Sequence, residues 1–458
     1  MQSKRNPMNS LERRAVGGLA GIFALRMMGL FLILPVFALY AEGLRGHTAL
    51  LVGLALGVYG LTQAVFQIPL GRLSDRIGRK PVIAGGLLLF AVGSVVAALS
   101  DTMLGVIIGR ALQGAGAIAA AVLALAADLT RDEQRTKAMA IIGVSIGASF
   151  IVSMILGSVL NESIGVPGIF WLTSVLALGG IAVLMFWVPT PAAPGRLPAT
   201  SATPVQFREV LRNPRLLRLD IGIFILHCVL TALFVVVPLA LVKHAGLASS
   251  GHWAVYVPVM LLSAVFMIPL IILAERKGLM RQIFAGTVLL LAVAQLVMWQ
   301  GYQSLAGLVI GLFLFFLAFN FLEAALPSLV SRAAPLATKG TAIGVYTTFE
   351  FLGAFAGGAA GGWLYGEFGI GAVFVFSAGL LLLWFVLALK TPAVTHLTTR
   401  TVNVGSQAPA EAQMMAQRLS AVPGVAEAVV KAEEGVAYLK VDAGRLDQEA
   451  LERCLAAG

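Results

Sequence analysis

One segment of this chain occurs twice, at residues 61–80 and again at residues 261–280. The first copy reads LTQAVFQIPLGRLSDRIGRK and the second LLSAVFMIPLIILAERKGLM, so that Asp75 corresponds to the carboxylate Glu275. Each copy is an apolar, membrane-length stretch that ends in a loop with a carboxylate, an arginine and a glycine. Similarity at a fixed spacing between apolar segments predicts a helical membrane protein built from two related halves, which is typical of transporters.

The composition excludes a soluble fold. Hydrophobic residues make up 59% of the 458 residues and charged residues 12%, and the mean hydropathy is +0.92. A helix crosses a bilayer with about 20 apolar residues. Twelve such spans are predicted, six before the polar stretch at 190–215 and six after it: 15–40, 48–70, 80–99, 104–128, 138–159, 166–188, 217–242, 252–274, 282–300, 304–330, 340–364 and 369–390. The first contains Arg26 and no small-residue cleavage site, so we expect it to be a retained span and not a secretory signal.

Lysine and arginine residues predict the orientation. They are concentrated in the loops to which even-numbered crossings return, whereas the opposite loops carry Arg45 and Lys243. By the positive-inside rule, both termini are expected to be cytoplasmic. The net charge of +10 is spread over several short loops, so a nucleic-acid partner is not expected. Cys228 and Cys454 form no CxxC pair, and neither a disulfide nor a metal site is predicted from them.

Changes in composition predict four parts: an N-terminal six-helix bundle at 1–188, a cytoplasmic linker with an amphipathic segment at 189–216, a C-terminal six-helix bundle at 217–390 and a soluble domain at 391–458. We expect the basic segment 207–218 to lie along the lipid surface.

The tail pattern predicts a small ferredoxin-like βαββα domain. Its expected elements are strands at 401–404, 425–431 and 436–441, helices at 409–419 and 447–455, and a turn at 433–435. The strand pair resembles heavy-metal-associated domains, but the loop GSQAPA after the first strand has no cysteine, so metal binding is not expected. A module for protein partners or self-association is the favoured interpretation, and a solvated cap is the alternative.

The loop after the second span reads GRLSDRIGRK, from Gly71 to Lys80. It resembles the G-x-L-[AS]-D-R-x-G-R-[RK] signature of the major facilitator superfamily, in the position where that family places it. Gly71 and Gly78 permit close helix approach and a tight turn. The superfamily resemblance covers about residues 12–390, and the first span, the tenth span and the ferredoxin-like tail together resemble those members that are proton-driven efflux transporters.

This resemblance implies a conformational latch at the cytoplasmic side. Asp75 would cap the positive end of a neighbouring helix, and Arg79 would pair with Asp128 at the end of the fourth span. The contacts would hold this side shut, and breaking them would permit inward opening. The alternative for Arg72, Arg76 and Lys80 is that they enforce topology.

The fourth span carries RALQGAG, close to the family signature R-x-x-Q-G-x-G. Arg110, Gln113 and Gly114 share a helix face. An unpaired arginine in lipid is costly, so Arg110 is expected to face the central cavity, where a carboxylate or backbone carbonyls neutralise it. Its role is proton coupling or substrate contact, and the alternative is an interhelical hydrogen-bond lock.

Other polar residues lie within predicted spans: Arg26, His227, Asn320, Glu323 and Glu350. A proton-coupled carrier needs a carboxylate that responds to desolvation and to a nearby cation, and Glu323 and Glu350 are the candidates. Glu323 is favoured because it lies deep in its span, with Asn320 on the same face. For His227, a packing role is favoured over a proton relay.

The eleventh span repeats glycine at Gly353, Gly357 and Gly361, which predicts close helix packing. The fifth span, with Gly143 and Gly157, resembles the glycine-rich signature of drug antiporters but has no Gly-Pro pair. Antiport is therefore not fixed by the sequence.

The favoured function is a bacterial inner-membrane exporter that exchanges a small amphipathic solute for protons. The alternatives are a symporter that imports an anionic metabolite bound by Arg26 and Arg110, and a sensor that signals through the tail. No enzyme activity, cofactor or nucleotide-binding loop is expected.

Overall fold

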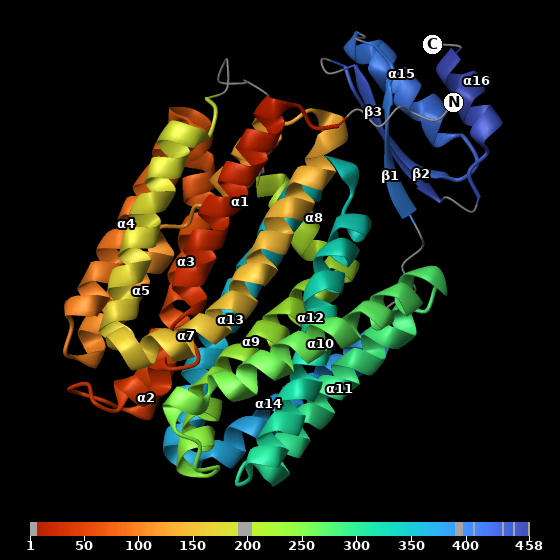
Figure 1. Cartoon of the computed structure of the whole chain (residues 1–458). Helices are drawn as coiled ribbons and strands as arrows, with labels where there is room; N and C mark the ends of the chain where they lie inside the picture. The colour runs from red at the N-terminus through yellow and green to blue at the C-terminus, as the bar shows by residue number, and fades with distance from the viewer. Residues whose placement is uncertain are drawn as a thin grey trace.

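The computed structural model describes residues 7–190, 204–389, 397–405, 408–432, 435–442 and 445–456. Long helices form one bundle, and a small sheet with two helices lies at one end of it (Figure 1). We call the end of the bundle where α1 begins and α14 ends the terminal face, and the other end the opposite face.

The helices of the N-terminal half alternate between these two faces. They are α1 (Ser10–Phe31), α2 (Phe37–Ala41), α3 (Ala49–Ile77), α4 (Arg79–Leu99), α5 (Met103–Ala115), α6 (Ala119–Asp128), α7 (Asp132–Ala182) and the π-helical turn η1 (Val183–Trp187). The predicted first span is divided by a turn at 32–36, which contains Pro35, and the fourth is interrupted after Gly116. Each of these spans is therefore a pair of shorter helical pieces.

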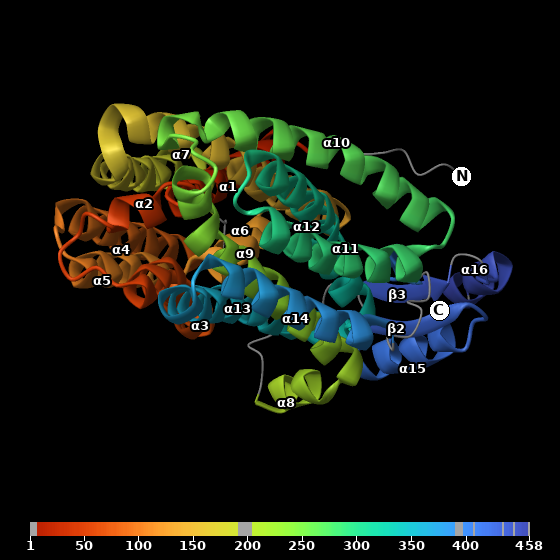
Figure 2. The ribbon, with the colours of Figure 1, turned by 90° about the horizontal axis from the view of Figure 1, so that it is seen from below.

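The C-terminal half follows the same alternation. It comprises α9 (Pro214–Lys243), η2 (Ser249–Gly251), α10 (Trp253–Arg276), α11 (Met280–Gly301), α12 (Leu305–Ala333), η3 (Leu336–Thr338), α13 (Lys339–Phe368) and α14 (Ile370–Leu389). Before it, α8 (Pro204–Arg212) lies on the outside of the bundle (Figure 2). The predicted basic segment 207–218 is thus divided at Asn213, whose side chain caps α9 by accepting from the Arg215 amide at 3.0 Å.

Among the described residues, 10 helical segments are long and apolar enough to cross a membrane. One of them, which includes α7, contains two crossings, because Gly165 leaves the helical conformation with φ of 67° and turns the chain back. The glycine-rich α13 also runs the length of the bundle. Together these make the twelve crossings predicted from the sequence, six in each half.

Helix α13 is in direct backbone contact with helices on both of its sides. A Cβ atom added to Gly357 would lie 1.9 Å from the Cys228 carbonyl oxygen of α9. One added to Gly358 would lie 2.3 Å from the Gly53 carbonyl oxygen of α3. The predicted glycine stripe therefore packs α13 against the second half and, one residue later, against the first.

The tail has the predicted order of elements. These are β1 (Leu397–Asn403), α15 (Pro409–Ser420), β2 (Val425–Lys431), β3 (Val436–Asp442) and α16 (Gln448–Ala456). The strands are antiparallel in the order β1-β3-β2. Alternate residues of β3, namely Ala437, Leu439 and Val441, are fully buried in a small apolar core. The first strand begins earlier than expected, and two residues of the predicted 433–435 turn lie outside the described residues.

The tail is docked on the link between α12 and α13. Glu427 of β2 accepts a hydrogen bond from the Leu336 amide at 2.9 Å, and Lys440 of β3 donates to the Ala334 carbonyl. Lys440 and Glu427 also form an ion pair at 3.4 Å. Lys440 is buried and Glu427 is 31% exposed, and the hydrogen bonds of these two side chains to the α12–α13 link join the tail to the bundle.

The glycine contacts predict opposite effects for two similar substitutions. Gly357→Ala forces α13 away from the α9 backbone. It is expected to lower the free energy of unfolding by about 1–3 kcal/mol. Gly286→Ala is the control, because a Cβ there meets no atom within 4 Å, and it should stabilise the helix by about 1 kcal/mol. Thermal unfolding in detergent measures both. Equal stability of the two variants would contradict this packing.

Candidate functional site

Three titratable side chains from three helices meet at the middle of the bundle. His227 lies on α9, Glu323 on α12 and Glu350 on α13. The His227 Nε2 atom is 3.6 Å from Glu350 Oε1 and 3.9 Å from Glu323 Oε2. We call these residues the triad.

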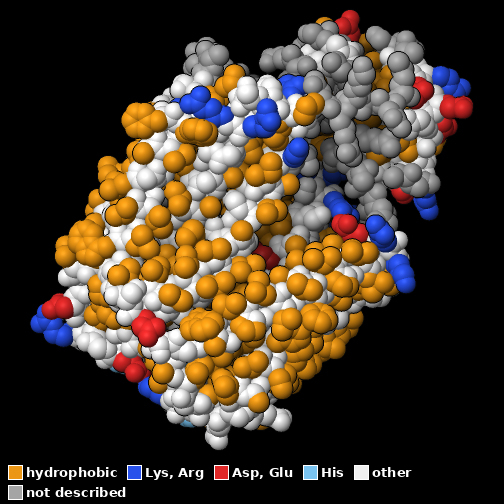
Figure 3. Space-filling view, viewed as in Figure 1, with side chains coloured by type: hydrophobic (Ala, Val, Ile, Leu, Met, Phe, Trp, Pro, Cys, Tyr) orange, Lys and Arg blue, Asp and Glu red, His pale blue; other side chains and the backbone are white. Residues whose placement is uncertain are grey.

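The three side chains of the triad lie within the span region and differ in exposure. The Glu323 side chain is 41% exposed, and those of Glu350 and His227 are more enclosed. Figure 3 shows a hollow between the two halves, with acidic atoms set back in it. The Glu323 carboxyl group is therefore partly exposed although it lies within a span.

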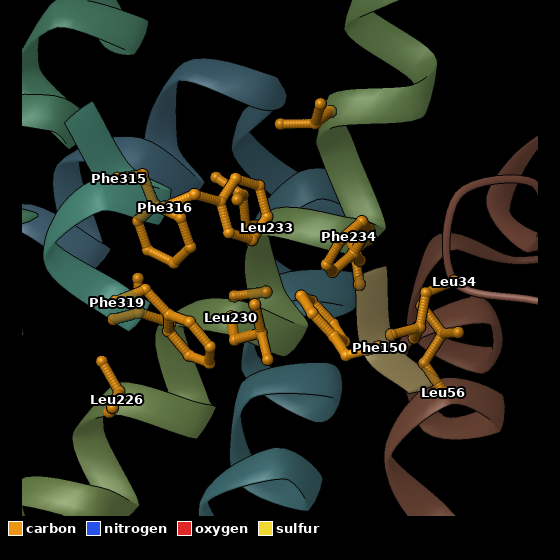
Figure 4. Close-up of a cluster of buried hydrophobic side chains, with 14 of the residues drawn as sticks. Leu34, Leu56, Phe150, Leu226, Leu230, Leu233, Phe234, Phe315, Phe316 and Phe319 are labelled. Carbon is orange, nitrogen blue, oxygen red and sulfur yellow. The ribbon is translucent and has the colours of Figure 1, made fainter. Parts of the chain in front are cut away.

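Figure 4 shows a layer of apolar side chains from α7, α9 and α12. Phe234 of α9 and Phe316 of α12 lie farther along their helices toward the opposite face than the triad residues do. Phe150 of α7 meets Phe316 and Phe319 of α12, with ring centroids 6.1 and 6.2 Å apart. The ring of Phe319 also lies 6.0 Å from that of His227. Because Phe150 comes from the first half and the other rings from the second, the layer joins the halves and separates the triad from the opposite face.

The triad has two chemical capacities. Its three possible ligand atoms lie within 4.8 Å of one another, so these residues are the group among the described ones that could hold a metal ion. Two carboxylates beside an imidazole also share and exchange protons, because each charge changes the proton affinity of the others. Asn320 does not join the triad, since its Nδ2 donates to Ser263 Oγ of α10 at 3.1 Å.

Arg26 and Arg110 form a separate polar cluster inside the first half. Arg26 donates to Gln63 Oε1 at 2.5 Å, and its guanidinium lies 5.8 Å from the centre of the Tyr59 ring. Arg110 lies over the same ring at 5.1 Å. Among the described residues, no ion pair joins either arginine to Glu323 or Glu350. The cations are therefore stabilised by amide oxygens and an aromatic face.

The signature of the fourth span is part of this cluster. Arg110 donates to Gln113 Oε1 at 2.8 Å and to the Ala55 carbonyl at 3.3 Å. Gln113 in turn donates to Ser94 Oγ at 2.7 Å. Gly114 lets α5 approach α3, since an added Cβ would lie 2.2 Å from the Tyr59 carbonyl. In this conformation the motif connects α3, α4 and α5, and both Arg110 and Gln113 are fully buried.

The residues predicted for the latch lie together at the terminal face. Gly78, with φ of 100°, makes the turn from α3 to α4. Arg79 then pairs with Asp75 and lies 3.3 Å from Asp128 at the end of α6. Arg79 also donates to Ser74 Oγ at 2.7 Å. All of these contacts are within the first half, and here Asp75 binds Arg79.

Two further predicted latch residues occupy simpler positions. An added Cβ at Gly71 would lie 3.2 Å from the Cβ of Ala120, so this glycine brings α3 close to α6. Arg76 is exposed.

The second copy of the repeat carries a related ion pair. Glu275, which corresponds to Asp75, lies 3.7 Å from Arg332 at the end of α12. Each half therefore has an ion pair that joins the region where its second span meets its third to the end of its fourth span. In the first half the residue of the repeat that pairs with the end of the fourth span is Arg79, whereas in the second half it is Glu275, the counterpart of Asp75.

The sequence analysis missed three polar residues that face α13 or lie on it. Gln67 of α3 donates to the Gly344 carbonyl and to Thr348 Oγ1, both at 3.2 Å, and so connects the halves. Asp220 of α9 and Tyr346 of α13 are both buried. Isolated polar residues in apolar spans, such as Asp220 in RLDIGIF, were the available signal.

Known proteins resemble this chain over most of its length. Residues 19–358 match the family model described as the Major Facilitator Superfamily. The inner membrane transport protein YajR of Escherichia coli (strain K12) is 44% identical over 444 residues, which cover 97% of each chain. The tetracycline resistance protein, class B, of Escherichia coli is 32% identical over 176 residues, 36% of this chain and 42% of that protein.

A solved structure supports the same fold. The bacterial homologue of the human lysosomal transporter Spinster, in an inward-facing and unoccupied conformation, has a TM-score of 0.67 and 15% identity, covering 84% of this chain and 98% of its own. The family match, the YajR relative and the twelve crossings agree with one another. The chain belongs to the major facilitator superfamily, and it is a membrane transporter and not an enzyme.

Proposed function

We propose that this protein is a proton-coupled secondary transporter that exports a small amphipathic solute across the bacterial inner membrane by alternating access. The observation that carries the proposal is the triad of His227, Glu323 and Glu350 between the helices that join the two halves. Intramembrane ionisable residues are costly and mark ion or substrate pathways. The similarity to YajR, named an inner membrane transport protein, supports the location.

Proton coupling follows from the chemistry of the triad. Carboxylates such as Glu323 and Glu350 hold fewer protons when a cationic group approaches and more when the site is desolvated. Solute entry and proton binding therefore compete for one site. Such competition makes the two movements opposite in direction, as exchange requires.

The orientation and the conformation support export. We place the terminal face in the cytoplasm, because the basic loops lie there. The apolar layer then closes the triad toward the periplasm, and the Glu42–Lys243 ion pair joins the halves at that end. This arrangement corresponds to an inward-facing state, in which the triad takes up solute from the cytoplasm.

The buried arginines favour export over the import of an anion. Arg26 and Arg110 are fully buried within the first half and donate to Gln63 and Gln113, so in this conformation an anion has no exposed cation to bind. Three of their buried nitrogen atoms, Arg26 Nε and Nη1 and Arg110 Nη2, have no partner among the described residues. The partial relative named a tetracycline resistance protein also agrees with efflux. A symporter for an anionic metabolite is the alternative.

We further propose the division into a bundle at 1–188, a linker at 189–216, a bundle at 217–390 and an accessory domain at 391–458. The docking of Lys440 and Glu427 on the α12–α13 link supports a role for the accessory domain beside the moving helices. A protein partner, or a second copy of the chain, would bind on the part of this domain that is not docked.

Neutralising the triad should uncouple transport. In proteoliposomes with an imposed pH gradient, solute-driven proton movement is measured with ethidium, chloramphenicol and benzoate as cationic, neutral and anionic probes. Glu323→Gln is expected to abolish the proton movement, because a glutamine binds no proton at neutral pH. Glu350→Gln and His227→Gln are expected to reduce it about tenfold or more.

Glu367→Gln is the matched control, since Glu367 is an exposed carboxylate near the opposite face. Proton movement opposite to the solute, present in this control and lost in Glu323→Gln, supports the exporter. Movement of benzoate and protons in the same direction would replace the proposal by the symporter. If Glu323→Gln couples solute to protons as well as the wild type does, Glu323 has no part in the coupling.

The Arg79–Asp128 contact is present in this inward-facing conformation and lies within the first half. We therefore expect it to stabilise the first half and not to hold the cytoplasmic side shut. Asp128→Asn removes the ion pair with Arg79 and leaves the Arg79–Asp75 pair. The substitution is expected to weaken the contact between α4 and α6 by about 1 kcal/mol. We expect slower transport at normal expression. Glu275→Gln is the control, because its pair with Arg332 is longer and more exposed, and its effect should be smaller. Equal rates for wild type and Asp128→Asn would show that the latch contact does not limit transport.

A further inference from the structure

A buried carboxylate that the triad does not include lies on α9 toward the terminal face. Asp220 is 1% exposed, and neither of its oxygens accepts a hydrogen bond from a described residue. It is the seventh residue of α9, about 9 Å along the helix from its start. An isolated carboxylate in such a place needs a proton or a cation to neutralise it. Asp220 therefore has the properties of a proton-binding group outside the triad.

Two helical faces align Asp220 with the triad. On α9, Asp220 and His227 are seven residues apart and so share one face. On α13, Tyr346 and Glu350 are one turn apart on one face. The two helices are in backbone contact through Gly353 and Gly357, which holds these faces in a fixed register.

Tyr346 lies nearer the terminal face than Asp220. The contacts of Gly353 with Phe224 and of Gly357 with Cys228 place residue 349 of α13 level with Asp220 of α9. Tyr346 is buried and interacts electrostatically with Glu323, Glu350 and Asp220. Asp220 and Tyr346 therefore extend the line of titratable groups from the triad toward the terminal face.

Asp220 forms no ion pair with any residue in the part of the chain that the structure describes. The elements packed against α9 are α2, α3, α8, α12, α13, α14 and η2. Among their described residues, Tyr346 is the titratable group that interacts with Asp220. A proton is thus the neutralising partner available to it in this conformation.

We infer that Asp220 is a proton-relay residue through which the triad exchanges its proton with the cytoplasm. The inference rests on the proposed proton coupling. A proton passes from the Glu350 carboxyl group to the Asp220 carboxylate through intervening water, so that one O–H bond breaks at Glu350 and one forms at Asp220. Asp220 then releases its proton toward the terminal face.

Protonation of Asp220 can be measured without a known substrate. Infrared spectra of the full chain in lipid report the C=O stretching band of protonated carboxyl groups as the pH is changed. We expect wild type to show a protonated carboxyl band that is missing in Asp220→Asn and returns, shifted, in Asp220→Glu. Asparagine has the shape of a protonated aspartate, so the variant should fold. Identical carboxyl bands in wild type and Asp220→Asn at every pH would overturn the inference.

Transport separates the relay from a merely structural role. Solute–solute exchange needs no proton release, whereas proton-driven net movement does. With ethidium as the probe, Asp220→Asn should reduce net movement about tenfold or more while exchange stays near the wild-type rate. Asp220→Glu should restore net movement with a shifted pH profile. An equal fall of exchange and net movement would overturn the relay.

The two proposals fail in different ways. If wild type couples ethidium to protons and Asp220→Asn couples them equally well, the relay is wrong and the exporter stands. If wild type shows no proton movement with any probe, the coupling itself is wrong and the relay falls with it, even where the infrared band of Asp220 is present.

Discussion

Backbone contact along α13 is the interaction on which the rest of the bundle depends. Lipid chains are as apolar as leucine, so helices in a bilayer associate by close packing and not by hydrophobic burial. Gly353 and Gly357 bring α13 against α9, and Gly358 brings it against α3 of the other half. Both halves are therefore held by one helix, and that helix also carries Glu350. Any motion of one half past the other must move a triad residue.

Polar groups are divided between the halves in a way that assigns them different tasks. The first half encloses Arg26 and Arg110 among amide oxygens and the Tyr59 ring, where every contact stays within that half. The second half contributes the triad, whose Glu323 is partly exposed. A rigid, fully buried cation cluster stabilises one half as a unit. An accessible set of carboxylates is suited to binding protons and solute.

The repeat explains why the two halves resemble each other in architecture and differ in chemistry. Both copies end in an ion pair with the end of the fourth span of their own half, but the pairing residue differs. It is Arg79 in the first half and Glu275, the counterpart of Asp75, in the second. Duplication preserves a geometric need, which is to join neighbouring helix ends at the membrane surface. Either order of charge meets that need, so the second copy was free to lose its signature.

The sequence by itself determined the class of protein, the twelve crossings, the order of elements in the tail and the polar residues within the spans, because lipid permits few residue types and few backbone forms. It also indicated Glu323 and Glu350, since a carboxylate in a span is rarely accidental. Tertiary structure alone decided that His227 joins these carboxylates, that Arg26 and Arg110 do not, and that Asp220 and Tyr346 line the same contact. The reason is rotation: a sequence places a residue along a helix, but the direction it faces is set by how the helices pack, here by the glycines of α13.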